Sequence, residues 1–178
     1  MSKILFFCAQ KKGLCSLIFV PCPFSVSSFV EIKPSIFKSK EIFLSLPSPT
    51  SIPTGTYRVV WIGPNWFVSL ARFSLALVSF QNWWGKDFSG STRSINLFSQ
   101  KNSEALLQKY PMNTAITKSK LDGRDAIQLT YGKDSPFPWF WFVDEFREFS
   151  PSILLGVSYL KWLPGLALPF AVEKGTSS

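Results

Sequence analysis

The chain of 178 residues contains no histidine. A Ser/His/Asp or Cys/His catalytic arrangement, a histidine-ligated zinc or non-haem iron, and a histidine general base all require an imidazole ring. The sequence therefore excludes the commonest hydrolase designs and every metal site built on histidine.

Cysteine is scarce as well, and its three residues, Cys8, Cys15 and Cys22, all lie near the N-terminus. Three thiols without a histidine cannot complete a four-ligand zinc site, and the sequence contains no C-x-x-C pair. We therefore predict no metal site and no cofactor, and we interpret the cysteines as incidental to the fold.

Charged residues make up 17% of the chain, against roughly 25% in an average soluble protein. The net charge of +8 is divided evenly: residues 1–50 hold six lysines and two glutamates, and the remainder holds thirteen basic and nine acidic side chains. A protein that binds a phosphate backbone concentrates its cations in a stripe. Since no basic run is present, we predict no nucleic-acid partner.

Apolar and aromatic residues are abundant instead. The hydrophobic fraction is 46% and the aromatic fraction 16%, with 18 phenylalanines and 7 tryptophans. This composition excludes a disordered or collagen-like chain, and the length suits one domain with a substantial core. The oligomeric state is left open.

Residues 1–54 have the composition of a poorly structured leader or linker. Nine serines occur in the first fifty residues, and residues 47–53 are rich in proline and serine. The stretch from Gly13 to Val30 is uncharged, but Pro21 and Pro23 interrupt it, so we expect no membrane-spanning helix there. Three interpretations are open: a secretory signal, an organelle transit peptide, or an upstream extension that folds little, which we favour. The compartment follows this choice: cytoplasmic for the extension, exported or organellar for a targeting segment.

Residues 55–178 show the pattern of an all-β domain, with short apolar runs separated by turn residues. Apolar residues from Asn65 to Ser79 recur instead at helical spacing after Pro64, which predicts one helix behind the first strand. The Asp122-Gly123 pair indicates a hairpin turn. We predict a mainly β fold, a small antiparallel barrel of eight or nine strands, from the segments Gly55–Ile62, Trp83–Phe88, Ser94–Ser99, Ala105–Lys109, Thr114–Ser119, Asp125–Tyr131, Phe140–Phe149, Ile153–Lys161 and Leu166–Glu173.

The densest cluster of aromatic and charged residues is PFPWFWFVDEFREFS, residues 136–150. Strand alternation predicts that Trp139, Trp141, Glu145 and Arg147 share one face, with Asp144 on the other. If the first face points into the barrel, Arg147 is a donor for Glu145 or for a ligand carboxylate. If it points outward, the two residues form a surface ion pair of at most about 1 kcal/mol. Structural pairing is the simpler of these explanations.

A second cluster, Trp83-Trp84-Gly85-Lys86-Asp87-Phe88, follows the predicted helix. Alternation places Trp84 and Lys86 on one face and Trp83 on the other. Gly85 indicates a bend in the strand or the close approach of a ligand. Core packing explains both tryptophans without a ligand.

The order of several short motifs resembles that of uncharacterised lipocalin-like bacterial proteins with a G-x-W-x-G motif. The motifs are Gly55-Thr56-Tyr57-Arg58, then W-W-G-K-x-F at Trp83 to Phe88, D-E-x-R at Asp144 to Arg147, Leu155-Gly156, and Pro169-Phe170. The resemblance covers residues 55–174. The chain departs from the motif at Tyr57, where the family has tryptophan, and at Val59, where it has the second glycine. The resemblance implies a calycin-type barrel with an apolar interior, without a settled reaction; haem-binding barrels of this shape use a histidine ligand, which this chain lacks.

We expect a barrel that binds a hydrophobic or amphipathic small molecule in its interior. Two alternatives are kept: an acid/base enzyme of the isomerase or cyclase type, with Glu145 or Asp144 as the catalytic group, and a structural or membrane-peripheral domain without a ligand. A cavity carboxylate without a neighbouring cation would favour the enzyme. The candidate ligand-binding residues are Trp84, Lys86, Trp139, Trp141, Glu145 and Arg147.

Overall fold

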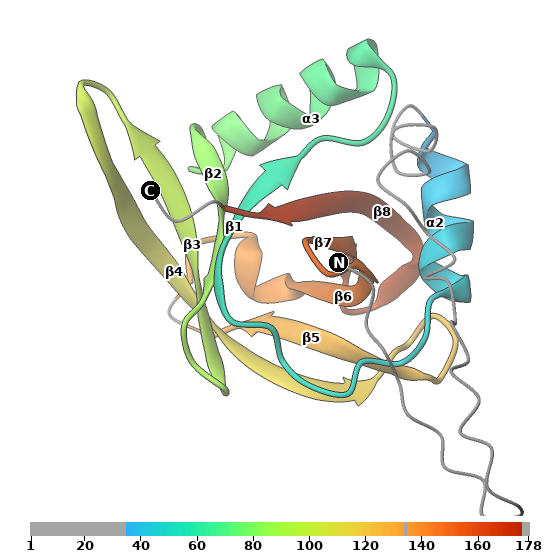
Figure 1. Ribbon diagram of the computed structural model, residues 1–178. Helices are drawn as coiled ribbons and strands as arrows, with labels where there is room; N and C mark the ends of the chain where they lie inside the picture. The colour runs from blue at the N-terminus through green and yellow to red at the C-terminus, as the bar shows by residue number, and fades with distance from the viewer. Residues whose placement is uncertain (1–34, 134, 176–178) are drawn as a thin grey trace, which may run out of the picture.

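The computed structural model describes residues 35–133 and 135–175 (Figure 1). Its sheet is a closed antiparallel barrel in which each strand pairs with the next in sequence and β8 returns to β1. This confirms the predicted fold class, a mainly β closed barrel with a helix after its first strand. The strands are β1 (Gly55–Val60), β2 (Trp83–Phe88), β3 (Arg93–Gln100), β4 (Ser103–Lys118), β5 (Asp125–Tyr131), β6 (Phe142–Ser150), β7 (Ile153–Leu160) and β8 (Leu163–Lys174).

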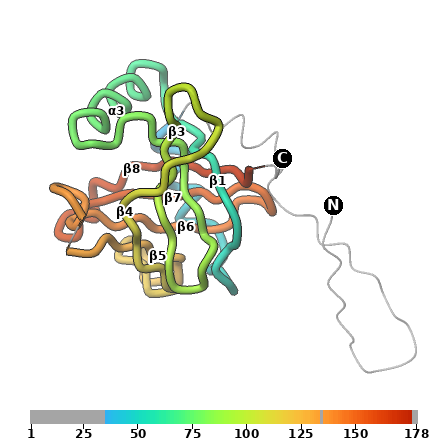
Figure 2. The backbone as a smooth tube through the Cα atoms, turned by 90° about the vertical axis from the view of Figure 1, so that its left-hand side faces the viewer, coloured from blue at the N-terminus to red at the C-terminus, as the bar shows by residue number. Residues whose placement is uncertain are grey.

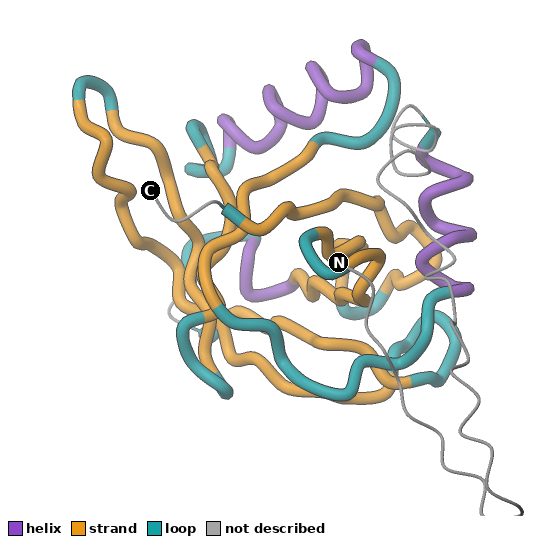
Figure 3. Tube along the Cα trace, viewed as in Figure 1, coloured by secondary structure: helices purple, strands orange, loops and turns teal. Residues whose placement is uncertain are grey.

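Three helical segments accompany the barrel in the described part of the chain (Figure 3). Helix α3 (Asn65–Leu77) joins β1 to β2, and the amides of Phe67 and Val68 both donate to the carbonyl of Pro64. A short 3-10 turn, η1 (Trp139–Trp141), precedes β6. Helix α2 (Ile36–Ser45) precedes the barrel and lies against β7 and β8.

Helix α2 falls within the stretch that composition predicted to be a poorly structured leader. Its N-cap, Ser35, accepts a hydrogen bond from the amide of Lys38, and Phe43 and Leu46 are fully buried against the outside of the barrel. Residues 35–54 therefore belong to the folded unit, because an amphipathic turn of helix covers an apolar barrel face. The three cysteines, the stretch from Gly13 to Val30 and the targeting interpretations lie outside the described residues.

The segment predicted as two strands, Ala105–Lys109 and Thr114–Ser119, is one long strand, β4. Pro111 lies within this strand, although proline cannot donate to a sheet ladder. The structure accommodates it with an irregularity: Tyr110 has a φ of +55°, and the pairing with β3 shifts register between Ile95 and Asn96. Hence the barrel has eight strands.

Two apolar clusters hold the fold together, one on each side of the sheet. The inner cluster fills one part of the barrel and includes Phe88, Leu129 and Phe146. The outer cluster lies between α2 and the strands and includes Phe43 and Tyr159. The sheet is thus covered on both faces, so strands β6 and β7 are buried along nearly their whole length rather than on alternate residues only.

Replacing Gly85 with alanine is expected to lower the free energy of unfolding by about 3 kcal/mol, because the new methyl group has no room. A Cβ at this position would lie 1.9 Å from the carbonyl oxygen of Tyr57 and 2.9 Å from the Cα of Arg58, both backbone atoms of β1. Guanidinium denaturation measures the change. Gly132→Ala is the matched control, since nothing lies within 4 Å of a Cβ there. Equal stability of the two variants would contradict the observed approach of β1 to β2.

Candidate functional site

A cavity of about 400 Å³ lies between α3 and the barrel interior. Residues from α3, from the connection before β6, and from β2, β5, β6, β7 and β8 line it. Its wall is mainly apolar and aromatic, which is typical of a small-molecule site. The lining residues are Trp61, Ile62, Phe67, Leu70, Ala71, Ser74, Leu75, Val78, Phe80, Trp83, Lys86, Tyr131, Pro138, Trp139, Phe142, Asp144, Ser158, Leu168, Pro169 and Phe170.

A buried ion pair forms the main polar feature of this wall. The Nζ atom of Lys86 lies 2.9 Å from Oδ2 of Asp144, and their side chains are 1% and 7% exposed. Lys86 also donates to Oδ1 of Asn96 at 3.0 Å and approaches Sδ of Met112 at 3.4 Å. The ammonium therefore has three partners for its three protons.

Burial and the neighbouring charge act on Lys86 in opposite directions. Burial lowers the pKa of its ammonium, and the Asp144 carboxylate partly offsets that effect. The pair as a whole presents no net charge to the cavity while both groups are ionised. Tyr131 lies beside it, with its ring 5.8 Å from the Lys86 Nζ atom, and burial raises the pKa of its phenol well above 10.0.

Aromatic contacts hold another part of the cavity wall in place. The rings of Phe80 and Trp139 have centroids 3.8 Å apart, and Phe80 also stacks on Tyr110. Nε1 of Trp139 donates to the carbonyl of Val78, the residue that caps the C-terminus of α3. This hydrogen bond ties η1 to the end of the helix, so the two segments border the cavity together.

The structure brings three of the candidate residues together at the cavity: Lys86, Asp144 and Trp139. Trp84, Trp141, Glu145 and Arg147 do not line it. The alternation predicted from Trp139 onward does not hold, because residues 139–141 form a 3-10 turn and the strand begins only at Phe142. Trp139 consequently lies on the cavity side with Asp144, and the face that carries Glu145 and Arg147 is the outer one.

A bulge in β2 explains why the prediction for Trp83–Phe88, which placed Trp83 on the face opposite Lys86, was also wrong. The pairing of β2 with β3 shifts register between Trp83 and Gly85. Trp83 therefore lines the cavity on the same side as Lys86, with its ring 5.4 Å from the Lys86 Nζ atom. Gly85 marks the close approach of β1 rather than of a ligand.

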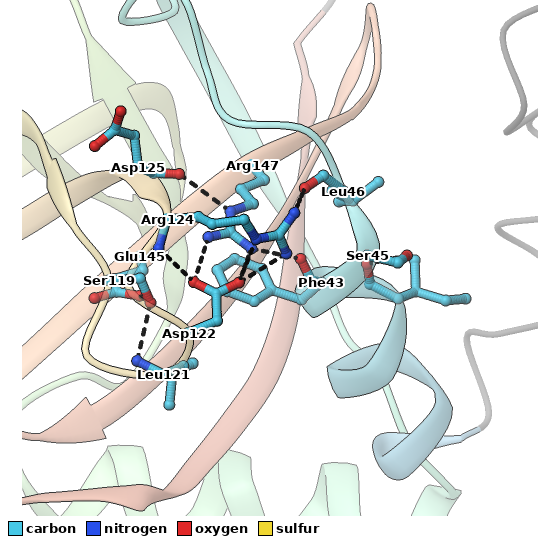
Figure 4. A network of polar contacts seen from close by, with 11 residues as sticks. Phe43, Ser45, Leu46, Ser119, Leu121, Asp122, Arg124, Asp125, Glu145 and Arg147 are labelled. Carbon is cyan, nitrogen blue, oxygen red and sulfur yellow. Dashed lines mark hydrogen bonds and ion pairs between the residues drawn. The ribbon is translucent and has the colours of Figure 1, made fainter.

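Arg147 is the centre of a separate polar network on the outer face (Figure 4). Its guanidinium is fully buried and donates to both carboxylate oxygens of Asp122 at 2.8 Å, and also to the carbonyls of Phe43 and Asp125. These bonds hold the pKa of the Asp122 carboxyl well below its ordinary value of 3.8. The network joins the turn between β4 and β5 to the end of α2, which is a structural role.

Glu145 has its own buried partners on the same outer face and does not pair with Arg147. Ser119 donates to one of its oxygens at 2.5 Å, and Tyr159 donates to the other at 2.5 Å. Burial, and then the bond to Glu145, raise the pKa of the Tyr159 phenol. Glu145 is therefore enclosed by donors and has no access to the cavity.

Sequence reasoning missed Tyr131, Asn96 and Met112, the remaining neighbours of Lys86. They come from β5, β3 and β4, and only closure of the barrel brings them to one point. A polar Asn96 within the run Ser94-Ile95-Asn96-Leu97-Phe98 is the one local signal that could have indicated a buried polar partner.

No group of three or more Cys, Asp or Glu side chains within residues 35–133 and 135–175 is arranged to hold a metal ion. In the same part of the chain, every helix is too short or too polar to cross a bilayer.

The fold and the cavity define this chain as a closed eight-stranded antiparallel barrel with a mainly apolar cavity beneath α3. Comparison with protein-family models and with curated proteins gives no match. Among solved structures, the chain is similar to one described as "Crystal structure of protein from Thermomonospora curvata". The two are 18% identical, with a TM-score of 0.58 over 77% of this chain and 85% of that one. At this identity the likeness shows the fold alone.

Proposed function

We propose that the protein binds an apolar small molecule with one polar group in the cavity beneath α3, as lipocalin-like barrels do. The observation that carries this proposal is the Lys86–Asp144 pair set in an otherwise mainly apolar wall. A pocket of about 400 Å³ has the size of such a site, and a sparse polar anchor in it orients a ligand.

The ion pair also supports a choice of polar group. Asp144 neutralises Lys86, so a ligand carboxylate close to the Lys86 ammonium would also lie close to the Asp144 carboxylate, which would repel it. A hydroxyl or carbonyl group can hydrogen-bond to the pair without this repulsion. We therefore favour a neutral head, such as that of a fatty or isoprenoid alcohol, over an anionic one.

The second candidate function is acid/base catalysis by Asp144 on an apolar substrate, because this carboxylate does face the cavity. The Lys86 ammonium, 2.9 Å away, occupies one of the two oxygens of Asp144. The criterion stated for an enzyme, a cavity carboxylate without a neighbouring cation, is not met, and this supports the binding protein.

The test uses parinaric acid and the corresponding alcohol, whose fluorescence reports energy transfer from Trp61, Trp83 and Trp139 in the cavity wall. Both probes are expected to bind, the alcohol more tightly. Ala71→Trp fills the cavity from α3 and should weaken binding by about tenfold or more. The matched control is Ala76→Trp on the same helix, which does not line this cavity. Absence of probe binding to the native protein, or equal affinity of the two variants, would refute the proposal.

A further inference from the structure

An exposed apolar surface surrounds the mouth of the cavity. On α3, Trp66, Phe73 and Leu77 are 67%, 63% and 71% exposed, although helix residues such as Phe67 and Leu75 face the cavity. Leu70 on α3 and Leu168 on β8 line the cavity and are still about half exposed. The cavity therefore opens between two apolar segments, and its wall continues into the surface.

The turn between β7 and β8 and the connection before β6 extend this surface. Trp162 and Leu166 are exposed in and beside that turn, and Phe137 is exposed before η1. Trp141 joins the two segments, with its ring 5.1 Å from those of Phe137 and Trp162. In Figure 2 both segments reach the left side of the barrel, below α3 on that same side. We call the exposed apolar residues of these three segments the apolar rim: Trp66, Leu70, Phe73, Leu77, Phe137, Trp162, Leu163, Leu166 and Leu168.

The charges of the rim segments have one sign. Arg72 is the only charged residue from 59 to 85, Lys161 is the only one from 149 to 172, and residues 135–143 have none. Two further cations are held at the turn between β7 and β8: Lys40 donates to the carbonyl of Gly165, and Lys120 to that of Lys161. Apolar and tryptophan side chains bordered by Lys and Arg are typical of surfaces that lie in the headgroup region of a bilayer.

We propose that the apolar rim docks on the surface of an anionic lipid bilayer, with α3 lying in the plane of the interface. The +8 net charge and the rim cations complement anionic headgroups. A two-fold contact between copies of this chain would instead bring the same cations toward one another. The inference goes beyond ligand binding in the cavity and does not depend on it.

Co-sedimentation tests the proposal, with vesicles of phosphatidylcholine alone and vesicles in which about a third of the lipid is phosphatidylglycerol. The full chain is expected to bind the anionic vesicles at least about tenfold more tightly, and added salt should reduce the difference. No binding to either vesicle, or equal binding to both, would overturn the proposal.

Two sets of variants separate the apolar and the charged contributions. The triple variant Trp66→Gln, Phe73→Gln, Leu77→Gln should lower partitioning into the anionic vesicles by about tenfold or more, because none of these side chains reaches the interior. The double variant Lys120→Gln, Lys161→Gln should lower partitioning by about fivefold for each lysine removed, and only with anionic vesicles. Ile116→Gln and Lys118→Gln, both on β4 outside the rim segments, are the matched controls and should bind as the native chain does.

Parinaric alcohol binding and thermal unfolding establish that each variant is folded. Triple-variant protein that retains probe binding but loses vesicle binding supports the docking surface independently of the cavity. Vesicle binding unchanged in the triple variant would overturn the proposal. The proposal would also be overturned if the native chain bound no vesicles and sedimentation equilibrium showed it to be a dimer and the triple variant a monomer.

Discussion

Replacing Lys86 with methionine is expected to lower the free energy of unfolding by about 3–5 kcal/mol, because it leaves the Asp144 carboxylate buried without a counter-ion. Asp144→Asn should have a cost of the same order, since the ammonium then loses its anionic partner. Urea denaturation at neutral pH measures both changes. The double variant Lys86→Met, Asp144→Leu removes both charges together and should recover most of the stability.

The same variants separate the structural from the binding role of the pair. The double variant keeps an apolar cavity of similar size but offers no polar group for a ligand head. We expect its affinity for parinaric alcohol to fall by about tenfold, because the ligand head loses its hydrogen bonds to charged groups. Unchanged affinity in a stable double variant would show that the pair does not contact the ligand. Single variants as stable as the native protein would contradict the burial of the pair itself.

Replacing Arg147 with methionine is expected to lower the free energy of unfolding by about 3–5 kcal/mol and to detach α2 from the barrel. The guanidinium bonds to both oxygens of Asp122 and to the last turn of α2 at Phe43, over whose ring it also lies at 4.8 Å. Arg124→Met is the matched control. Arg124 bonds to the same carboxylate, but its side chain is 42% exposed, so its removal should cost about 1 kcal/mol or less.

The pH dependence of Asp122→Asn checks the electrostatic part of this effect. The folded protein holds the pKa of Asp122 below 3.8, so the carboxylate stabilises the fold above that pH. Its contribution is lost as the pH falls below 3.8 toward the lower folded value. The stability difference between the native chain and Asp122→Asn should therefore be largest near neutral pH and shrink in acid. A difference that is independent of pH would contradict the ion pair.

Strand and helix positions were predictable because they depend on local patterns. Apolar spacing after Pro64 predicted α3, and strand-like composition predicted every strand of the barrel, although β4 was predicted as two strands. Helix α2 was not predicted, because the serine-rich composition of residues 1–54 outweighed the short amphipathic segment around Phe43. Its stability comes from the barrel face beneath it, which no local window contains.

The candidate site was predictable only in part. Lys86, Asp144 and Trp139 were named from the density of aromatic and charged residues in two segments, and all three line the cavity. Their companions were misplaced because alternation fails at a bulge and at a 3-10 turn: the bulge turns Trp83 inward, and the turn separates Trp139 from Glu145. A displacement of one residue reverses the face of a side chain in a strand.

By itself, the sequence determined that no histidine chemistry is available, that the domain is mainly β, and that its lysines and arginines occur without a basic run. Tertiary structure alone decided which carboxylate faces the cavity, that Asp144 pairs with Lys86, and that Arg147 pairs with Asp122 rather than Glu145. The physical reason is that these partners come from strands and turns far apart in the chain. Closure of the barrel, and the local irregularities that closure requires, set which side of the sheet each one occupies.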